Sequence, residues 1–63
     1  MARGIIKSYY EDERFGYIEA ADGQSIFFHH SDLEDAVKVG DQVEFDVTQG
    51  THSRQAVYVR KQD

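Results

Sequence analysis

The chain of 63 residues contains no cysteine, no proline and no tryptophan. Without cysteine it can form neither a disulfide framework nor a thiolate zinc site, although a domain this small usually needs such a staple. It also has no long apolar run and no charged leader followed by an apolar stretch, so the sequence predicts neither a membrane span nor a secretory signal. We therefore expect one small cytoplasmic domain over residues 1–63 that does not bind membranes.

Positive charge is scarce as well. Seven Lys and Arg residues against twelve Asp and Glu residues give a formal net charge of −5. A protein that coats phosphates without specificity would carry the opposite sign, so any nucleic-acid binding must rely largely on uncharged contacts. Hydrophobic residues make up 40% of the chain and aromatic residues 13%, which is too apolar for a disordered acidic tail.

The chain does contain a series of short β-branched and aromatic runs in which apolar and polar residues alternate. The alternation predicts strands over residues 4–10, 14–20, 25–29, 42–48 and 55–60. Asp22-Gly23 indicates a hairpin turn between the second and third strands, with positive φ at both residues. After the third strand, Ser31 through Glu34 has the pattern of a capping box and predicts about one helical turn capped by Ser31.

Five predicted strands in so short a chain leave two arrangements, an open sheet with exposed edges or a barrel that removes them. Gly4 and Gly16 lie inside predicted strands and indicate the strong bending that barrel corners need. We therefore expect an all-β fold, a small five-stranded antiparallel Greek-key barrel of the OB type with one short helical turn after strand 3. The expected core comprises Ile6, Ile18, Ile26, Phe28, Val43, Phe45, Val47 and Val59.

Parity within the second and third strands predicts an aromatic surface. If Ile18, Ile26 and Phe28 fill the core, the residues that point outward on these adjacent strands are Phe15, Tyr17, Phe27 and His29. The alternative is an inverted sheet, which would bury His29 beside Phe27 and expose Ile18 and Ile26. Outward rings can stack on unpaired bases of any sequence, at about 1–3 kcal/mol per base.

Signatures of catalysis and of metal binding are missing from the sequence. There is no cysteine nucleophile, no Gly-x-Ser-x-Gly elbow and no glycine-rich phosphate loop before a helix. A barrel this small also lacks a pocket that could exclude water, so we expect no enzyme, no cofactor and no small-molecule substrate. His29, His30, Asp32 and His52 could suggest a metal site, but adjacent strand residues point to opposite faces and we expect none.

The motifs resemble those of the bacterial cold-shock domain. Arg14-Phe15-Gly16-Tyr17-Ile18 and Ile26-Phe27-Phe28-His29-His30 are similar to the two ribonucleoprotein-type motifs of that family. Gly4-Ile5-Ile6-Lys7 and Val39-Gly40-Asp41-Gln42-Val43-Glu44-Phe45 are similar to its first and fourth strands, so the resemblance covers essentially the whole chain. It implies a five-stranded barrel that binds single-stranded RNA or DNA and acts as an RNA chaperone or as a regulator of transcription or translation.

The resemblance also implies which residues bind nucleic acid. Ser8 stands where the family has a tryptophan, Arg14 where it has a glycine, and Arg54 where it has a proline, and one of Tyr9 and Tyr10 should face outward and partly replace the lost stacking area. The expected nucleic-acid-binding residues are Lys7, Ser8, Tyr10, Arg14, Phe15, Tyr17, Phe27, His29, His30 and Arg54.

Two functions remain open at this point. The first is weak, stacking-dominated binding of single-stranded RNA or DNA by a monomer. For this function we expect Lys7, Arg14, Arg54, Arg60 and Lys61 to gather on the binding side, away from Glu34, Asp35, Glu44 and Asp46. The second is a protein-interaction module on an OB-type barrel with weakened nucleic-acid binding, because exposed rings and an acidic surface could bind a basic partner.

Overall fold

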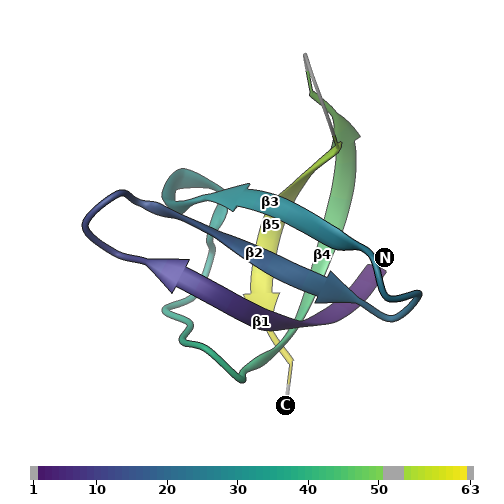
Figure 1. Cartoon of the computed structure of the whole chain (residues 1–63), viewed down its shortest axis with the longest axis horizontal. Helices are drawn as coiled ribbons and strands as arrows, with labels where there is room; N and C mark the ends of the chain where they lie inside the picture. Colours follow the sequence, from purple (N-terminus) through teal and green to yellow (C-terminus); the bar gives the residue numbers. More distant parts are fainter. Residues whose placement is uncertain (1, 51–53, 63) are drawn as a thin grey trace.

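The computed structural model describes residues 2–50 and 54–62. The described residues form β1 (Ala2–Tyr10), β2 (Phe15–Ala20), β3 (Ser25–His29), the short 3-10 helix η1 (His30–Asp32), β4 (Gln42–Gln49) and β5 (Arg54–Lys61). The strands close into a barrel in the order β1-β2-β3-β5-β4. Figure 1 shows β1, β2 and β3 side by side, with β4 and β5 crossing behind them. The predicted all-β barrel of five strands with a short helical turn after the third is confirmed.

One strand pairing departs from the antiparallel arrangement that we expected. Four pairings are antiparallel, but β3 and β5 run parallel and pair through Phe27 with Gln55 and Phe28 with Ala56. An odd number of strands cannot alternate in direction all the way around a closed ring. Closing this barrel therefore requires a parallel pair, and the β3–β5 contact supplies it.

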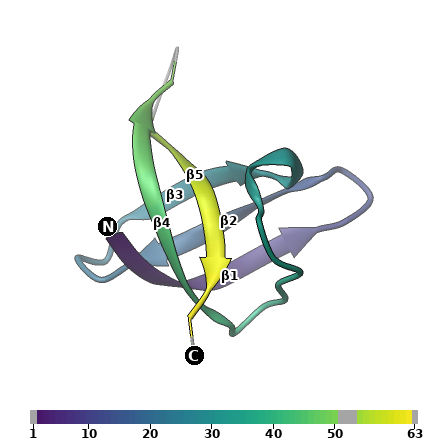
Figure 2. The ribbon, with the colours of Figure 1, turned by 180° about the vertical axis from the view of Figure 1, so that it is seen from behind.

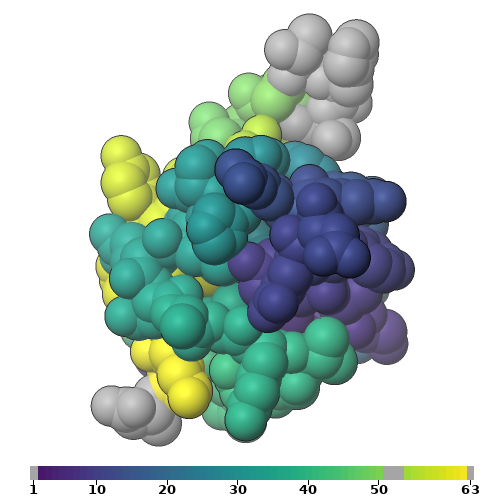
Figure 3. Space-filling view, turned by 90° about the vertical axis from the view of Figure 1, so that its left-hand side faces the viewer, coloured from purple at the N-terminus to yellow at the C-terminus, as the bar shows by residue number. Residues whose placement is uncertain are grey.

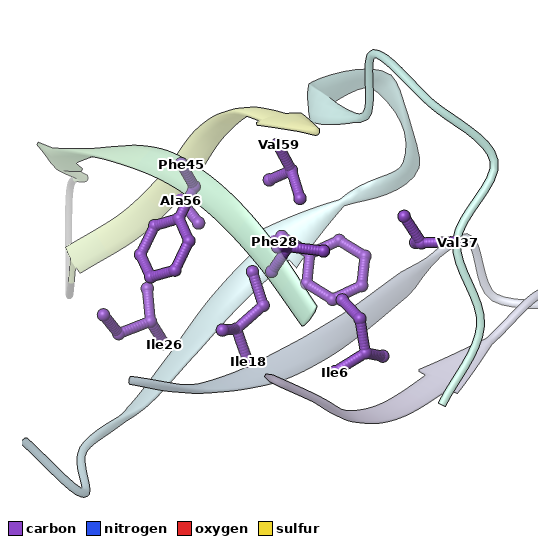
Figure 4. Close-up of a cluster of buried hydrophobic side chains, with 9 residues drawn as sticks. Ile6, Ile18, Ile26, Phe28, Val37, Phe45, Ala56 and Val59 are labelled. Carbon is purple, nitrogen blue, oxygen red and sulfur yellow. The ribbon is translucent and has the colours of Figure 1, made fainter. Parts of the chain in front are cut away.

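The core lies between the two layers of the barrel and is entirely apolar among the described residues (Figure 4). Its buried members are Ile6, Ile18, Ile26, Phe28, Val37, Val43, Phe45, Ala56 and Val59. The prediction that Val47 belongs to the core is wrong, since this residue is 43% exposed. The last residues of β4, from Asp46 to Gln49, are all exposed, because the strand runs past the end of the barrel and has no layer opposite it (Figure 1).

Two β-bulges interrupt the alternation of the strands. In β1 the pairing with β2 shifts between Ile6 and Ser8, so Lys7 is the additional residue. In β5 the pairing with β4 shifts between Glu44 and Asp46, opposite Tyr58, whose φ is +53°. Because of this second bulge, Ala56 and Val59 both face the core although they are three positions apart.

The glycines of β1 and β2 allow their backbones to approach closely. A Cβ atom on Gly16 would lie 2.3 Å from the Ser8 carbonyl oxygen and 2.7 Å from the Phe28 ring. A Cβ atom on Gly4 would lie 2.5 Å from the Glu19 carbonyl oxygen. Both contacts are shorter than van der Waals distance, so these positions exclude any side chain.

The β2–β3 hairpin turn has a different conformation from the one that we predicted. Gly23 has a φ of +88°, but Asp22 does not have a positive φ. Gly23 N–H donates to the Ala20 carbonyl at 2.9 Å, and Ala20 N–H donates to the Gln24 carbonyl at 2.8 Å. The loop is thus a longer turn that ends in one left-handed glycine, and the prediction for Asp22 was wrong.

The cap of η1 is also different from the prediction. His29, not Ser31, is the N-cap: its Nδ1 accepts from the Ser31 N–H at 3.1 Å. Asp32, not Glu34, completes the capping box by accepting from the His29 N–H at 3.0 Å. The helix begins directly after β3, so Ser31 already lies inside it. No helix among the described residues has the length and apolar character needed to cross a membrane.

Candidate nucleic-acid interface

An aromatic face covers the outer surface of β1, β2 and β3. In the register of these strands Tyr10 lies opposite Phe15, Phe15 opposite His29, and Tyr17 opposite Phe27. Directly opposed residues project to the same side of a sheet. We therefore use the name aromatic face for the surface formed by Tyr10, Phe15, Tyr17, Phe27 and His29.

The rings of the aromatic face contact one another. The Phe15 and Phe27 rings are stacked with centroids 5.8 Å apart, and Tyr17 meets them edge-on at 6.1 and 6.0 Å. The Tyr10 ring lies 5.3 Å from that of Phe15. Aromatic pairs at these distances stabilise each other beyond the area that they bury. The four rings therefore form one continuous, mutually supported platform.

The platform is outside the core and open to solvent. Tyr10 is 51% exposed and Tyr17 39% exposed, while Phe15 and Phe27 are half-buried by their neighbouring rings. Ile18 and Ile26, which the inverted alternative would expose, are buried. The predicted outward orientation of the β2 and β3 rings is confirmed, and the inverted sheet is wrong.

Ser8 lies at one end of the platform, opposite Tyr17 in the register of β1 and β2. Its position shows where a larger side chain would extend the row of rings. At the other end, Gln55 lies beside Phe27, and its Nε2 donates to Asp32 Oδ2 at 2.7 Å. Gln55 was not among the residues that the sequence predicted for this surface, because only the long-range parallel pairing of β3 and β5 brings it to Phe27.

His30 lies beside the aromatic face. The Tyr9 hydroxyl and the His30 Nδ1 are 2.7 Å apart, and the Tyr9 ring packs 5.6 Å from the ring of Phe28 in the core. Tyr9 thus faces inward, and Tyr10 is the tyrosine that joins the platform.

Tyr9, Arg14 and His30 line a hollow of about 660 Å³ together with Glu11 and residues 33–37. Figure 3 looks onto this end of the molecule, where the β1–β2 hairpin (blue) meets the segment after β3 (teal).

The predicted cationic residues are divided between two regions. Lys7, Arg14 and Arg54 directly precede Ser8, Phe15 and Gln55, which form part of the platform or its ends. Lys7 Nζ lies 3.3 Å from Glu19 Oε2, and Arg54 Nη1 donates to Gln24 Oε1 at 3.1 Å. The Arg14 carbonyl accepts from the His30 N–H at 2.7 Å.

The other two cations lie among carboxylates. Arg60 Nη1 is 3.6 Å from Glu34 Oε1, and the Lys61 N–H donates to Asp35 Oδ2 at 2.9 Å. The expectation that Arg60 would lie apart from Glu34 was wrong. The connection between η1 and β4 brings the acidic residues alongside β5, where the Glu34 N–H donates to the Val59 carbonyl at 2.7 Å.

The two adjacent histidines have separate partners. His29 Nδ1 bonds to Ser31 and His30 Nδ1 to Tyr9. In the part of the chain that the structure describes, no three metal-ligating side chains form a cluster. His52, the other residue considered for a metal, lies outside the described residues.

Residues 2–62 match the family model described as the 'Cold-shock' DNA-binding domain. The chain belongs to the cold-shock domain family. The major cold shock protein of Streptococcus pyogenes serotype M6 is 34% identical over 65 residues, which cover 97% of each chain. The cold shock protein CspC of Bacillus subtilis is also 34% identical over 65 residues, with 97% of this chain and 98% of that protein covered.

A solved structure shows the same barrel. This cold-shock domain superposes on drosophila Unr CSD456 with a TM-score of 0.83 and 26% sequence identity. The match covers 98% of this chain and 26% of that chain, so the chain spans about a quarter of that structure. Cold-shock domains bind nucleic acids and are not enzymes, in agreement with the prediction that this chain has no catalytic activity.

Proposed function

We propose that this cold-shock domain, a single domain over residues 1–63, binds single-stranded RNA or DNA by stacking bases on the aromatic face. The supporting observation is the set of contacting, outward rings of Phe15, Tyr17 and Phe27 on adjacent strands. Bases present a flat π-face in every sequence, so a continuous platform binds unpaired strands with little regard to sequence. A duplex hides those faces, so we expect selectivity for single strands.

The residues around the platform would complete the site. We assign base stacking to Tyr10, Phe15, Tyr17, Phe27 and His29, base contacts to Ser8 and His30, and phosphate contacts to Lys7, Arg14 and Arg54. The chain has a net charge of −5 and only these three cationic residues are assigned to phosphates, so stacking must supply most of the affinity. Weak binding of this kind suits an RNA chaperone or a regulator of transcription or translation, because such a protein must release the strand easily. We propose that the chain acts in this way as a monomer in the cytoplasm.

The test is a titration with short single-stranded pyrimidine oligonucleotides. Because the chain has no tryptophan and two of its four tyrosines lie on the aromatic face, tyrosine emission reports on the platform. We expect saturable quenching in the wild type, and a loss of about 1–3 kcal/mol of binding free energy for Phe15→Ala or Phe27→Ala. Val39→Ala is the matched control, since Val39 is an exposed apolar residue outside the platform.

Two results would contradict the proposal. One is the absence of quenching at low salt by protein whose fold is verified by circular dichroism. The other is equal affinity of the wild type and both phenylalanine variants, which would place the oligonucleotide on another surface.

A further inference from the structure

A second exposed tyrosine surface lies on β5, apart from the aromatic face. Tyr58 is 60% exposed and stands at the β5 bulge with a φ of +53°. A bulky residue rarely adopts a positive φ, and strained residues of this kind cluster at functional sites such as ligand clamps. In this chain the bulge turns the Tyr58 ring outward while Ala56 and Val59 remain in the core.

The Tyr58 ring borders a hollow of about 600 Å³ beside η1. Figure 2 shows β5 with η1 and the segment after it alongside. We call this hollow the η1–β5 hollow; its lining residues are Ser31, Asp32, Leu33, Glu34, Thr48, Val57 and Tyr58. The bond from the Glu34 N–H to the Val59 carbonyl, 2.7 Å long, holds the segment after η1 against β5. The hollow is therefore bounded by fixed backbone on two sides.

The lining of this hollow combines apolar surface with negative charge. Leu33, Val57 and the Tyr58 ring supply the apolar part, and Asp32 and Glu34 supply two carboxylates. Asp32 accepts hydrogen bonds from two neutral donors, the Gln55 amide and the His29 N–H. Glu34 faces Arg60 at 3.6 Å, and none of the lining residues is basic.

We propose that the η1–β5 hollow is a docking site for a basic protein segment. A lysine or arginine of that segment would place its charged group between the two carboxylates and over the Tyr58 ring, where a cation is attracted to the π-face. The alkyl stem of the same side chain would cover Leu33 and Val57. The hollow adjoins the edge of the aromatic face, since Ser31 bonds to His29 and Asp32 to Gln55. Its carboxylates repel phosphates, so the charge of the hollow favours a basic segment over nucleic acid.

The test uses a short synthetic peptide in which lysine alternates with leucine on both sides of one tryptophan. Since the protein itself contains no tryptophan, tryptophan emission reports only on the peptide. We expect a saturable blue shift with the full chain, and a loss of affinity of about tenfold in Tyr58→Asn. Asparagine tolerates a positive φ better than tyrosine, so this variant keeps its fold. Glu34→Gln should lower the affinity for the peptide about threefold and reduce the dependence of this affinity on salt.

Tyr10→Asn is the matched control, because Tyr10 is a similarly exposed tyrosine on the aromatic face. Tyr10→Asn should leave the affinity for the peptide unchanged and lower the affinity for a pyrimidine oligonucleotide. Tyr58→Asn should lower the affinity for the peptide and leave the affinity for the oligonucleotide unchanged. The proposal is overturned if the peptide does not bind, if wild type and Tyr58→Asn bind it equally, or if Tyr10→Asn is the variant that loses it. Loss of oligonucleotide binding in Tyr58→Asn would assign the hollow to nucleic acid and would also overturn it.

Discussion

The adjacent residues Phe27 and Phe28 have different roles because their side chains point to opposite sides of β3. Phe28 is fully buried and packs against Tyr9, while Phe27 faces outward and stacks on Phe15. The side-chain period of a strand is two, so neighbours in sequence lie on opposite sides of the barrel wall. One therefore contributes to stability, and the other we assign to binding.

This difference predicts opposite outcomes for two alanine substitutions. Phe28→Ala should lower the free energy of unfolding by about 3–5 kcal/mol, because it removes a ring from the centre of the core. A domain of 63 residues has only about 3–9 kcal/mol in total, so this variant should be close to unfolded. Phe27→Ala should cost about 1 kcal/mol, from its lost ring contacts. Urea denaturation of both variants measures the difference, and equal losses would contradict it.

Ser8 gives a prediction in the direction of tighter binding. It lies opposite Tyr17 at the end of the platform, on the same side of the sheet. Ser8→Trp should extend the stacking surface and strengthen oligonucleotide binding by about 1–3 kcal/mol. Fluorescence titration measures the gain, with Val39→Trp as the control for a new tryptophan placed elsewhere on the surface. An unchanged affinity would mean that bound strands do not reach this end of the platform.

The strands of this barrel depend on close backbone contacts and on bulges. Gly16 allows β2 to approach Ser8 and Phe28, and the bulge at Lys7 changes which β1 residues face the platform. After that bulge Tyr9 faces inward and Tyr10 outward. The presence of Tyr10, and not Tyr9, in the aromatic face is therefore a consequence of one additional residue in β1.

Gly16→Ala tests the close contact between β1 and β2. Its new methyl group would lie 2.3 Å from a backbone oxygen, which cannot move aside like a side chain. We expect a loss of about 1–3 kcal/mol in the free energy of unfolding. Gly23→Asn is the matched control, since a Cβ atom on Gly23 would meet nothing within 4 Å and asparagine tolerates the positive φ of that position. A loss in the control as large as that in Gly16→Ala would contradict the steric explanation.

The backbone strain at Tyr58, in the β5 bulge, can be tested by a stability measurement that needs no ligand. Tyr58 holds a positive φ, which costs a non-glycine residue about 1–3 kcal/mol. Tyr58→Asn should recover about 1 kcal/mol of this and raise Tm by about 4–8 °C. Thermal unfolding followed by circular dichroism measures the change. A lower Tm would show that packing of the ring outweighs the backbone strain.

Negative charge over the molecule as a whole determines how nucleic acid can be bound. The net charge is −5, and of the five predicted cations only Lys7, Arg14 and Arg54 are sequence neighbours of residues in the platform or at its ends. Arg60 and Lys61 lie near Glu34 and Asp35. The long-range attraction to a phosphate backbone is therefore small, so the binding that we propose depends on short-range stacking.

The salt dependence of binding should be correspondingly small. With three cations available for phosphates, the plot of log affinity against log salt should have a slope of about −2. Glu19→Gln should tighten binding slightly, because it frees Lys7 from the carboxylate 3.3 Å away. Titrations over a series of salt concentrations measure both effects. A slope much steeper than this would show that charge, and not stacking, supplies most of the affinity.

Local alternation along the chain was enough to predict the five strands, most of the core and the outward direction of the β2 and β3 rings. All of these follow from patterns over a few residues, because the two sides of a strand differ in their access to water. Ile18, Ile26 and Phe28 could be assigned to the interior by comparing the two strands, but alternation left the inverted sheet open until burial excluded it. The resemblance to the cold-shock domain added the expected nucleic-acid-binding residues outside these rings, among them Lys7, Ser8 and Arg54, whose roles remain predictions.

The features that depend on how distant strands align came from the folded barrel alone. The parallel β3–β5 pair brings Gln55 to Phe27, the bulges place Tyr9 inside and Tyr58 outside, and the barrel ends before Val47. The N-cap at His29 likewise depends on where β3 leaves the sheet. Each of these results from register between segments far apart in the chain, and register is set by the closure of the whole barrel, which local alternation does not specify.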